Sequence, residues 1–290
     1  MSLGTAHLLF SNPLYAAAGR FTIADPLQKI SLGRSGLETT LLGVGTGVSG
    51  GGRSSFLTRQ DKSKSIAVLK HAYDRGFRQF DLADTYGTHP LMAEALKGMN
   101  REELLLVSKI WTRGGGIPEK ERPDMDVVVD RFRKEIDTDY IDLVQIHCMV
   151  DADWTSSMKK QMDQLSDLKA RGIIRAHGVS VHSYEAMMAA LESPWVDVIH
   201  ARINPYGIAM DKAEPGDVVE LIQKLHASGK GVIGMKLIGN GDLRNESEKI
   251  DHSLKFVLGL GSVDMMIIGF ETEEQIDNYI GRVEKALQAI

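Results

Sequence analysis

Eight short apolar runs recur along the chain, and each is followed by a longer segment that mixes apolar and charged residues. The runs are Leu41–Gly45, Phe77–Leu82, Leu104–Ile110, Ile141–Ile146, Ile174–Val181, Val196–Ala201, Gly231–Met235 and Val263–Ile268. Runs of this length, several of them rich in Val and Ile, are typical of strands buried on both faces of a parallel sheet. The pattern therefore predicts eight buried strands.

Four of the intervening segments have the apolar spacing or the end signals of helices. They are Asp61–Arg75, Asp153–Arg171, Asp217–Ser228 and Glu271–Leu287. The third begins just after Pro215 and ends at Gly229, which matches the preference for Pro early and Gly late in a helix. Met158 and Met162 in the second lie at helical spacing, which favours a core-facing side.

Eight strand–helix units within 290 residues predict one (β/α)8 TIM barrel over residues 29–290. A doubly wound sheet is the rival fold, and it would bind a dinucleotide where its first strand turns into a helix. Gly43–Gly47 does follow a strand, but the glycine-rich loop Ser49–Gly52 comes next, and no helix start is visible there. The glycines of Leu32–Leu37, ahead of the first run, predict a tight β-hairpin that closes the bottom of the barrel.

Residues 1–28 form an N-terminal extension that differs from the rest of the chain. Leu8–Phe10 leads into the alanine-rich stretch Leu14–Ala18. This could be the remnant of an export signal, although no basic segment precedes it, and the other interpretation is a flexible arm. We expect a cytoplasmic protein, or a periplasmic one if the segment is such a remnant.

Composition narrows the functional classes. A net charge of −5 argues against nucleic-acid binding, and no apolar stretch is long enough for a membrane span. Cys148 is the only cysteine, so neither a disulfide framework nor a Cys-based metal site can form within one chain. His177 and His182 lack the spacing of metal ligands, and we expect no metal.

Polar residues follow three successive apolar runs. Asp81 closes the second run with Tyr86 in the loop beyond it, Lys109 ends the third, and His147 follows the fourth. Active sites of TIM barrels lie at these C-terminal strand ends. Each residue taken singly has an ordinary explanation. Asp81 could cap a helix, Lys109 could extend to solvent, and His147 could be a histidine of the core. Together they indicate a catalytic site.

At these residues the chain resembles the aldo-keto reductase family. The resemblance is carried, in the family's order, by Gly76–Gly87, Val107–Lys109, Tyr140–His147 and Gly172–Ser180, and it runs from about Ile30 to the C-terminus. It implies an NAD(P)-dependent oxidoreductase that interconverts an aldehyde or ketone with an alcohol, with Asp81, Tyr86, Lys109 and His147 as its catalytic residues.

The chemistry explains these residue types. A phenol with an ordinary pKa of about 10 can protonate a carbonyl oxygen, and a nearby ammonium is expected to lower that pKa. Lys109 would be this ammonium, held by Asp81. His147 would donate a hydrogen bond to the carbonyl oxygen, and the hydride would come from NADP or NAD.

The resemblance also implies cofactor contacts along the strand ends and the last two loops. The matched positions are Gly45, Thr46, Ser180, Arg202, Met235, Lys236, Leu237, Gly239, Gly241, Gly269, Phe270 and Gln275. Several depart from the family pattern. Val181 replaces an Asn, Met235 an aromatic residue, and His200 or Arg202 would have to serve in place of a Gln.

Gly269 and Gln275 stand where members selective for NADP often have Lys and Arg, and Glu271, Glu273 and Glu274 surround them. Acidic residues disfavour an additional phosphate, so we expect relaxed cofactor selectivity or a preference for NAD.

Residues near the other strand ends are candidates for the substrate pocket. Phe56, Trp111 and Trp154 could form its apolar walls, and Arg113 could meet an anionic substrate or simply be solvated. Two other functions stay open: a cofactor-binding sensor or regulatory subunit with vestigial activity, and an unrelated TIM-barrel lyase or isomerase. The substrate and the oligomeric state have no decisive motif.

Overall fold

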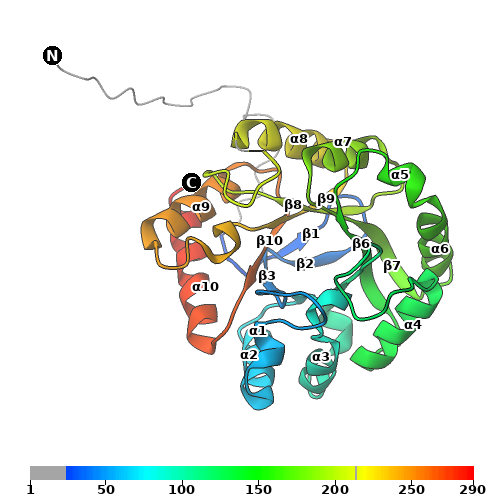
Figure 1. Cartoon of the computed structure of the whole chain (residues 1–290). Helices are drawn as coiled ribbons and strands as arrows, with labels where there is room; N and C mark the ends of the chain where they lie inside the picture. Colours follow the sequence, from blue (N-terminus) through cyan, green and yellow to red (C-terminus); the bar gives the residue numbers. More distant parts are fainter. Residues whose placement is uncertain (1–23, 213) are drawn as a thin grey trace.

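A computed structural model describes residues 24–212 and 214–290. Eight parallel strands close into a barrel in the order β10-β3-β4-β5-β6-β7-β8-β9, and helices surround it (Figure 1). The strands are β3 (Leu42–Gly45), β4 (Gln79–Asp81), β5 (Leu105–Ile110), β6 (Ile141–Met149), β7 (Ile174–Val181), β8 (Val198–Arg202), β9 (Gly231–Met235) and β10 (Met265–Gly269). The predicted (β/α)8 TIM barrel is confirmed.

The helices alternate with these strands. They are α1 (Phe56–Arg59), α2 (Lys62–Asp74), α3 (His89–Leu96), α4 (Met125–Ile136), α5 (Trp154–Ser157), α6 (Lys159–Ala170), α7 (Tyr184–Glu192), α8 (Pro215–Ala227), α9 (Ser247–Gly259) and α10 (Glu273–Gln288), with the 3-10 turns η2 (Asp84–Tyr86), η3 (Arg101–Glu103) and η4 (Gly239–Gly241).

The predicted elements correspond to the observed ones, with small differences at their ends. Asp61 caps α2 by accepting from the Ser63 and Lys64 amides, as expected of an N-cap aspartate. One prediction needs correction: Asp153–Arg171 is not one helix, because the backbone at Met158 leaves helical geometry and separates α5 from α6.

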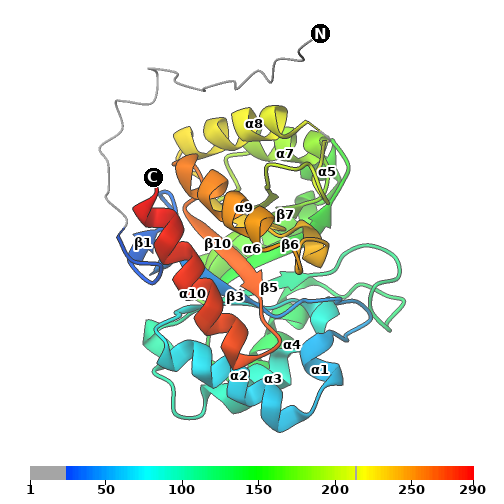
Figure 2. The same cartoon turned by 90° about the vertical axis from the view of Figure 1, so that its left-hand side faces the viewer.

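A short hairpin covers the N-terminal end of the barrel, as predicted. Its strands β1 (Lys29–Ser31) and β2 (Glu38–Thr40) pair antiparallel. Gly33, in the turn between them, has φ +51° and approaches the main chain so closely that a Cβ would lie 2.5 Å from the Gly231 nitrogen. Only glycine fits this contact. Figure 2 shows β1 at one end of the barrel.

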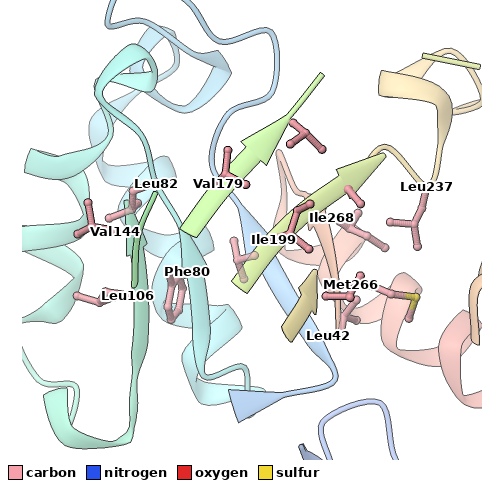
Figure 3. Close-up of a cluster of buried hydrophobic side chains, with 14 of the residues drawn as sticks. Leu42, Phe80, Leu82, Leu106, Val144, Val179, Ile199, Leu237, Met266 and Ile268 are labelled. Atoms are coloured by element: carbon pink, nitrogen blue, oxygen red, sulfur yellow. The ribbon is translucent and has the colours of Figure 1, made fainter. Parts of the chain in front are cut away.

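The two faces of the strands form two apolar layers. One face packs under the helices, with residues such as Phe80, Leu106 and Val144 (Figure 3). The other fills the lower part of the barrel, where Leu32 and Leu37 from the hairpin turn join inward-pointing residues of the strands. Those strand residues are Leu105, Val107, Leu143, Ala176, Val198, Ile233 and Met265. The hairpin thus completes the inner core.

The interpretations of residues 1–23 as a signal remnant or arm lie outside the described residues. Within the described chain, no helix is both long and apolar enough to cross a membrane.

We predict that Leu37→Ala destabilises the barrel by about 2–5 kcal/mol, because it opens a cavity in the inner core that the strands cannot close. Leu37 is 1% exposed. Urea unfolding measures the change. Val127→Ala is the control, since Val127 is 56% exposed and its truncation is expected to cost under about 0.5 kcal/mol. Equal losses in the two variants would contradict the role assigned to the hairpin.

Candidate active site

The two-residue period of a strand explains which side chains enter the barrel. In β5, Leu105 and Val107 belong to the inner core, so Lys109 also points inward, one layer nearer the C-terminal end. The same reasoning directs His147 inward above Leu143 in β6, and Ser180 above Ala176 in β7. A polar layer therefore lies on top of the apolar inner core.

Asp81 and Lys109 form the closest contact of this layer. Lys109 Nζ donates to Asp81 Oδ1 at 2.6 Å and to the Leu82 carbonyl oxygen at 3.0 Å. Both side chains are at most 3% exposed. A buried ammonium and a buried carboxylate are each unfavourable alone, so the structure requires both together.

The pKa of Asp81 reflects this pairing. Burial alone would raise it, but the charges of Lys109 and His200 outweigh burial and lower the pKa of Asp81 to about 2. Burial lowers the pKa of Lys109, and Asp81 opposes that shift. The two short contacts of the ammonium, both to oxygen, favour its charged form.

Tyr86 is placed by the turn η2, which buried ion pairs anchor. Asp84, at the start of η2, accepts from Arg53 and Arg131, each at 2.8 Å. The ring of Tyr86 lies against the loop after β3, where a Cβ on Gly47 would be 2.4 Å from Tyr86 Cζ. Glycine at position 47 therefore leaves the space that the phenol ring occupies.

His147 lies between two aromatic rings. Its ring centroid is 5.7 Å from that of Tyr86 and 5.5 Å from that of Trp111, both in edge-to-face geometry. Burial, together with the charge of Lys109, lowers the pKa of His147 well below its usual value, so the imidazole is neutral. His147 Nδ1 has no hydrogen-bond partner among the described residues. The four predicted catalytic residues are thus brought together.

One prediction about this cluster is wrong in direction. We expected Lys109 to lower the pKa of Tyr86, but burial and the negative charge of Asp81 raise it. The reason is geometric: Lys109 Nζ lies over the ring, 5.1 Å from its centroid, while its hydrogen bonds go to Asp81 and Leu82. The phenol therefore stays protonated.

Some predicted cofactor residues have groups that a ligand could use. Ser180 is 1% exposed, and its buried hydroxyl has no partner within the described chain. Such an unpaired buried hydroxyl is costly unless a ligand satisfies it. Met235 ends β9 and Lys236 follows it, with Lys236 Nζ donating to Asn240 Oδ1 at 2.6 Å.

Other predicted cofactor residues are already engaged. The Thr46 hydroxyl donates to the Asp81 carbonyl oxygen at 2.8 Å. The Leu237 side chain is in the core, and Phe270 packs against Phe77. Arg202 is paired with Asp211. Thr46, Leu237 and Phe270 can therefore offer main-chain groups only.

The two predicted phosphate loops differ in what they present. Gly239 and Gly241 have positive φ, and their amides donate within the turn, to Lys236 and Ile238. Gly45 and Gly269 face each other in the β3–β10 register, and the Val48 side chain covers Gly269, where a Cβ would be 2.2 Å from Val48 Cγ2.

Gln275 lies at the start of α10 and accepts from the Glu271 amide at 2.8 Å. Between Gly269 and Gln275 the charged residues are all acidic, and three glutamates stand there without a basic residue. An additional phosphate group bound at this loop would therefore be repelled by these glutamate carboxylates.

The three aromatic residues expected to line a substrate pocket differ in their surroundings. Trp111 contacts His147, as described above. Trp154 is 1% exposed, donates to the Ala186 carbonyl oxygen and packs near Trp195, so it belongs to the core and not to a substrate pocket. Phe56 begins α1 and is half-buried.

Two hollows flank the described barrel. One of about 190 Å³ lies beside the polar layer, lined by residues that include Asp84, Trp111 and Arg131. A larger one, of about 390 Å³, lies at the hairpin end and is lined by residues that include Arg34 and Lys230. Asp84 and Trp111 line the smaller hollow, but Asp81, Tyr86, Lys109 and His147 line neither of the two.

Sequence reasoning missed two residues of the polar layer. His200 was considered only as a cofactor contact, but it is fully buried, with Nε2 3.1 Å from Asp81 Oδ1 in poor hydrogen-bond alignment. His182, just beyond β7, lies 6.5 Å from His147 between ring centroids. The inward period of β8 would have identified His200, whereas His182 has no sequence signal.

The fold and this polar layer define a (β/α)8-barrel protein with a candidate site at the C-terminal strand ends. A model of the aldo/keto reductase family matches residues 41–256. The chain therefore belongs to the aldo-keto reductase family.

Individual relatives are distant. Probable aldo-keto reductase 1 of Glycine max is 28% identical over 171 residues, which are 57% of this chain and 48% of that protein. The matched segment thus spans about half the length of the curated relatives. A putative aldo-keto reductase of Pseudomonas aeruginosa has a TM-score of 0.73 at 24% identity, over 92% of this chain and 99% of that one.

A third relative is an aldo-keto reductase of Klebsiella pneumoniae in complex with NADPH. It has a TM-score of 0.65 at 18% identity, over 90% of each chain. At this identity the likeness bears on the fold alone.

We predict that Asp81→Asn makes the free energy of unfolding less dependent on pH under acidic conditions. Because the pKa of Asp81 is lowered from 3.8 to about 2, its stabilising contribution is complete above about pH 4 and is lost as the pH falls through 2. The contribution amounts to about 2 kcal/mol. The unfolding free energy from urea titrations should therefore fall more between pH 5 and pH 2 in the wild type than in Asp81→Asn.

Lys109→Met is the matched control: without the ammonium, Asp81 loses the charge that lowers its pKa. An equal pH dependence in the wild type and in Asp81→Asn would contradict the buried pair.

Proposed function

We propose that this protein is an NAD(P)-dependent oxidoreductase that reduces an aldehyde or ketone to an alcohol, or catalyses the reverse reaction. The observation that carries the proposal is the convergence of Asp81, Lys109, Tyr86 and His147 at one end of the barrel. Membership of the aldo-keto reductase family supports the same reaction class.

Tyr86 acts as the general acid in this proposal. The phenol is protonated at neutral pH, so it has a proton to give to the carbonyl oxygen as negative charge develops there, although its raised pKa makes it a weaker acid. Lys109 supplies positive charge beside the ring, and Asp81 positions that ammonium. For the reverse reaction Tyr86 must lose its proton, which the same pKa shift disfavours near neutral pH.

His147 orients the substrate. The neutral imidazole has one N–H to donate to the carbonyl oxygen, and the edges of the Tyr86 and Trp111 rings fix its plane. Because the donor is fixed before the substrate arrives, little reorganisation is needed as the oxyanion forms.

A nicotinamide cofactor fits the residues beside this cluster. When bound, it supplies the hydride that the carbonyl carbon accepts. In this proposal the Ser180 hydroxyl, which has no partner among the described residues, would bond the carboxamide, Met235 would pack on the ring, and Lys236 would meet a phosphate. The Klebsiella pneumoniae aldo-keto reductase, which shares this fold, is in complex with NADPH. We further propose that residues 29–290 form the single catalytic domain.

Tyr86→Phe tests the proposal. We expect NAD(P)H-dependent reduction of a panel of aldehydes and ketones to fall by about 10²–10⁴ in kcat, because the variant keeps the ring but has no proton to donate. The decrease in absorbance of the reduced cofactor measures it.

Tyr73→Phe is the matched control. It removes a hydroxyl that contacts Glu103 and the Asn100 amide at the outer face of the barrel, so activity should be unchanged. Turnover that survives Tyr86→Phe would refute the assigned acid. Cofactor binding without turnover of any carbonyl would favour the alternative of a sensor or regulatory subunit.

The acidic loop before α10 leads to a second prediction. We expect NADPH to bind no more tightly than NADH, because the 2′-phosphate of NADPH would meet Glu271, Glu273 and Glu274 instead of a basic side chain. Fluorescence titration of each reduced cofactor measures the two Kd values.

The paired substitution Glu273→Gln and Glu274→Gln should tighten NADPH binding several-fold and leave NADH within about twofold, since only NADPH carries the additional charge. Asp251→Asn, on the neighbouring helix α9, serves as a control for general charge. Much tighter binding of NADPH by the wild type would reject the expectation.

A further inference from the structure

The loop after β5 folds over the candidate site and holds Arg113 at its rim. Trp111 Nε1 donates to the Gly115 carbonyl oxygen at 2.6 Å, and a Cβ on Gly116 would lie 2.3 Å from the Trp111 ring. The Gly52 amide donates to the Gly116 carbonyl oxygen at 3.0 Å, which ties this loop to the one after β3. The main chain around Trp111 is therefore fixed.

Arg122 fixes the main chain of Arg113 itself. Its guanidinium donates to the Arg113 carbonyl oxygen at 2.9 and 2.6 Å and to the Gly115 carbonyl oxygen at 2.7 Å. These hydrogen bonds fix the main chain from which the Arg113 side chain extends.

The Arg113 side chain is exposed, and its guanidinium contacts two residues next to the candidate site. Its Nη1 is 3.6 Å from the Cys148 sulfur, and its central carbon is 5.9 Å from the centroid of the Trp111 ring. Cys148 directly follows His147, whose ring touches both Trp111 and Tyr86. The guanidinium is thus one side chain away from the candidate catalytic imidazole.

Among the described residues Arg113 has no acidic partner, unlike three other arginines near the site. Arg53 and Arg131 share Asp84, and Arg202 pairs with Asp211. Among the described residues, the one hydrogen-bond acceptor of the Arg113 side chain is a thiol, which is a weak acceptor. The planar set of N–H donors on the Arg113 guanidinium, at the rim of the site, therefore has no strong acceptor among the described residues.

Several positive charges lie near this rim. Asp81 is paired with Lys109, and the acceptor of the Lys236 ammonium within the described chain is the neutral Asn240 amide. Burial and the charges of Arg202, Lys236, Lys109 and Arg113 lower the pKa of His182 to about 3. An anion entering this rim would meet compensating charge.

We propose that the carbonyl substrate carries a carboxylate, which the Arg113 guanidinium binds while the carbonyl group lies at Tyr86 and His147. Planar guanidinium and carboxylate groups match in bidentate geometry, and the Trp111 ring offers an apolar surface between the two ends. The proposal rests on the proposed function for its chemistry: the carbonyl carbon gains the hydride from the reduced nicotinamide, the oxygen gains the proton of Tyr86, and the carboxylate is unchanged.

A matched pair of aldehydes tests this substrate class. 4-Carboxybenzaldehyde and methyl 4-formylbenzoate have the same ring and the same aldehyde position, but only the first is an anion. The ester withdraws electrons more strongly than the carboxylate, so a preference for the acid would not come from greater reactivity of its carbonyl group. We expect a kcat/KM about tenfold higher for the acid, which reflects one charge-assisted contact. Arg113→Gln should abolish this preference through a higher KM for the acid and leave the ester within about twofold.

Two control variants separate the specific contact from general charge. Arg113→Lys should keep part of the preference, since it retains the charge without the fork. Lys120→Gln removes an exposed cation of the same loop and should leave the preference intact. An unchanged acid-to-ester ratio in Arg113→Gln, or equal kcat/KM values in the wild type, would overturn the proposal.

A binding measurement distinguishes failure of this inference from failure of the proposed function. Benzoate should quench the fluorescence of Trp111 in the wild type, whereas benzamide should not, and Arg113→Gln should respond to neither. Loss of the response in Trp111→Phe would show that the signal comes from Trp111 and not from Trp154 or Trp195. Benzoate binding without carbonyl turnover would refute the proposed function alone, and turnover of both aldehydes without benzoate binding would refute the carboxylate site.

Discussion

The buried contact between Lys109 and Asp81 is the constraint around which the upper barrel is arranged. Each group alone would be an uncompensated charge in a site that excludes water, and removing one partner of such a pair typically costs about 3–5 kcal/mol. At 2.6 Å the two side chains hold neighbouring strands β4 and β5 in register at their C-terminal ends. His200, from the opposite side of the barrel, adds a further contact to the same carboxylate.

The polar layer depends in turn on the apolar layer beneath it. The hairpin turn inserts Leu32 and Leu37 into the lower barrel, and the strands contribute the remaining side chains. This plug lets the upper positions be polar without leaving the lower barrel open to water. The separation of stability at one end from chemistry at the other is general for TIM barrels.

The site itself is completed by loops instead of strands. Tyr86 depends on Asp84 and its two arginines, on Gly47 from another loop, and on the edge of the His147 ring. Trp111 and Arg113 belong to a loop that closes through its own Arg122 contacts. Side chains distant in the sequence thus share one small volume, and this proximity raises the pKa of Tyr86 and lowers that of His147.

The sequence by itself predicted the barrel, because eight apolar runs with intervening helical segments admit few architectures. It also predicted that Asp81, Tyr86, Lys109 and His147 share one site, because strand ends converge in such a barrel and these residues lie in motifs that resemble the aldo-keto reductase family. The tertiary structure decided what spacing along one chain cannot encode. It divided the segment from Asp153 to Arg171 at Met158, buried Trp154 and Phe270 in the core, engaged Arg202 with Asp211, and placed the Lys109 ammonium over the ring of Tyr86. These outcomes depend on distances between side chains from different strands and loops. The pKa of a group likewise depends on the charges near it in space and on how deeply the protein buries it.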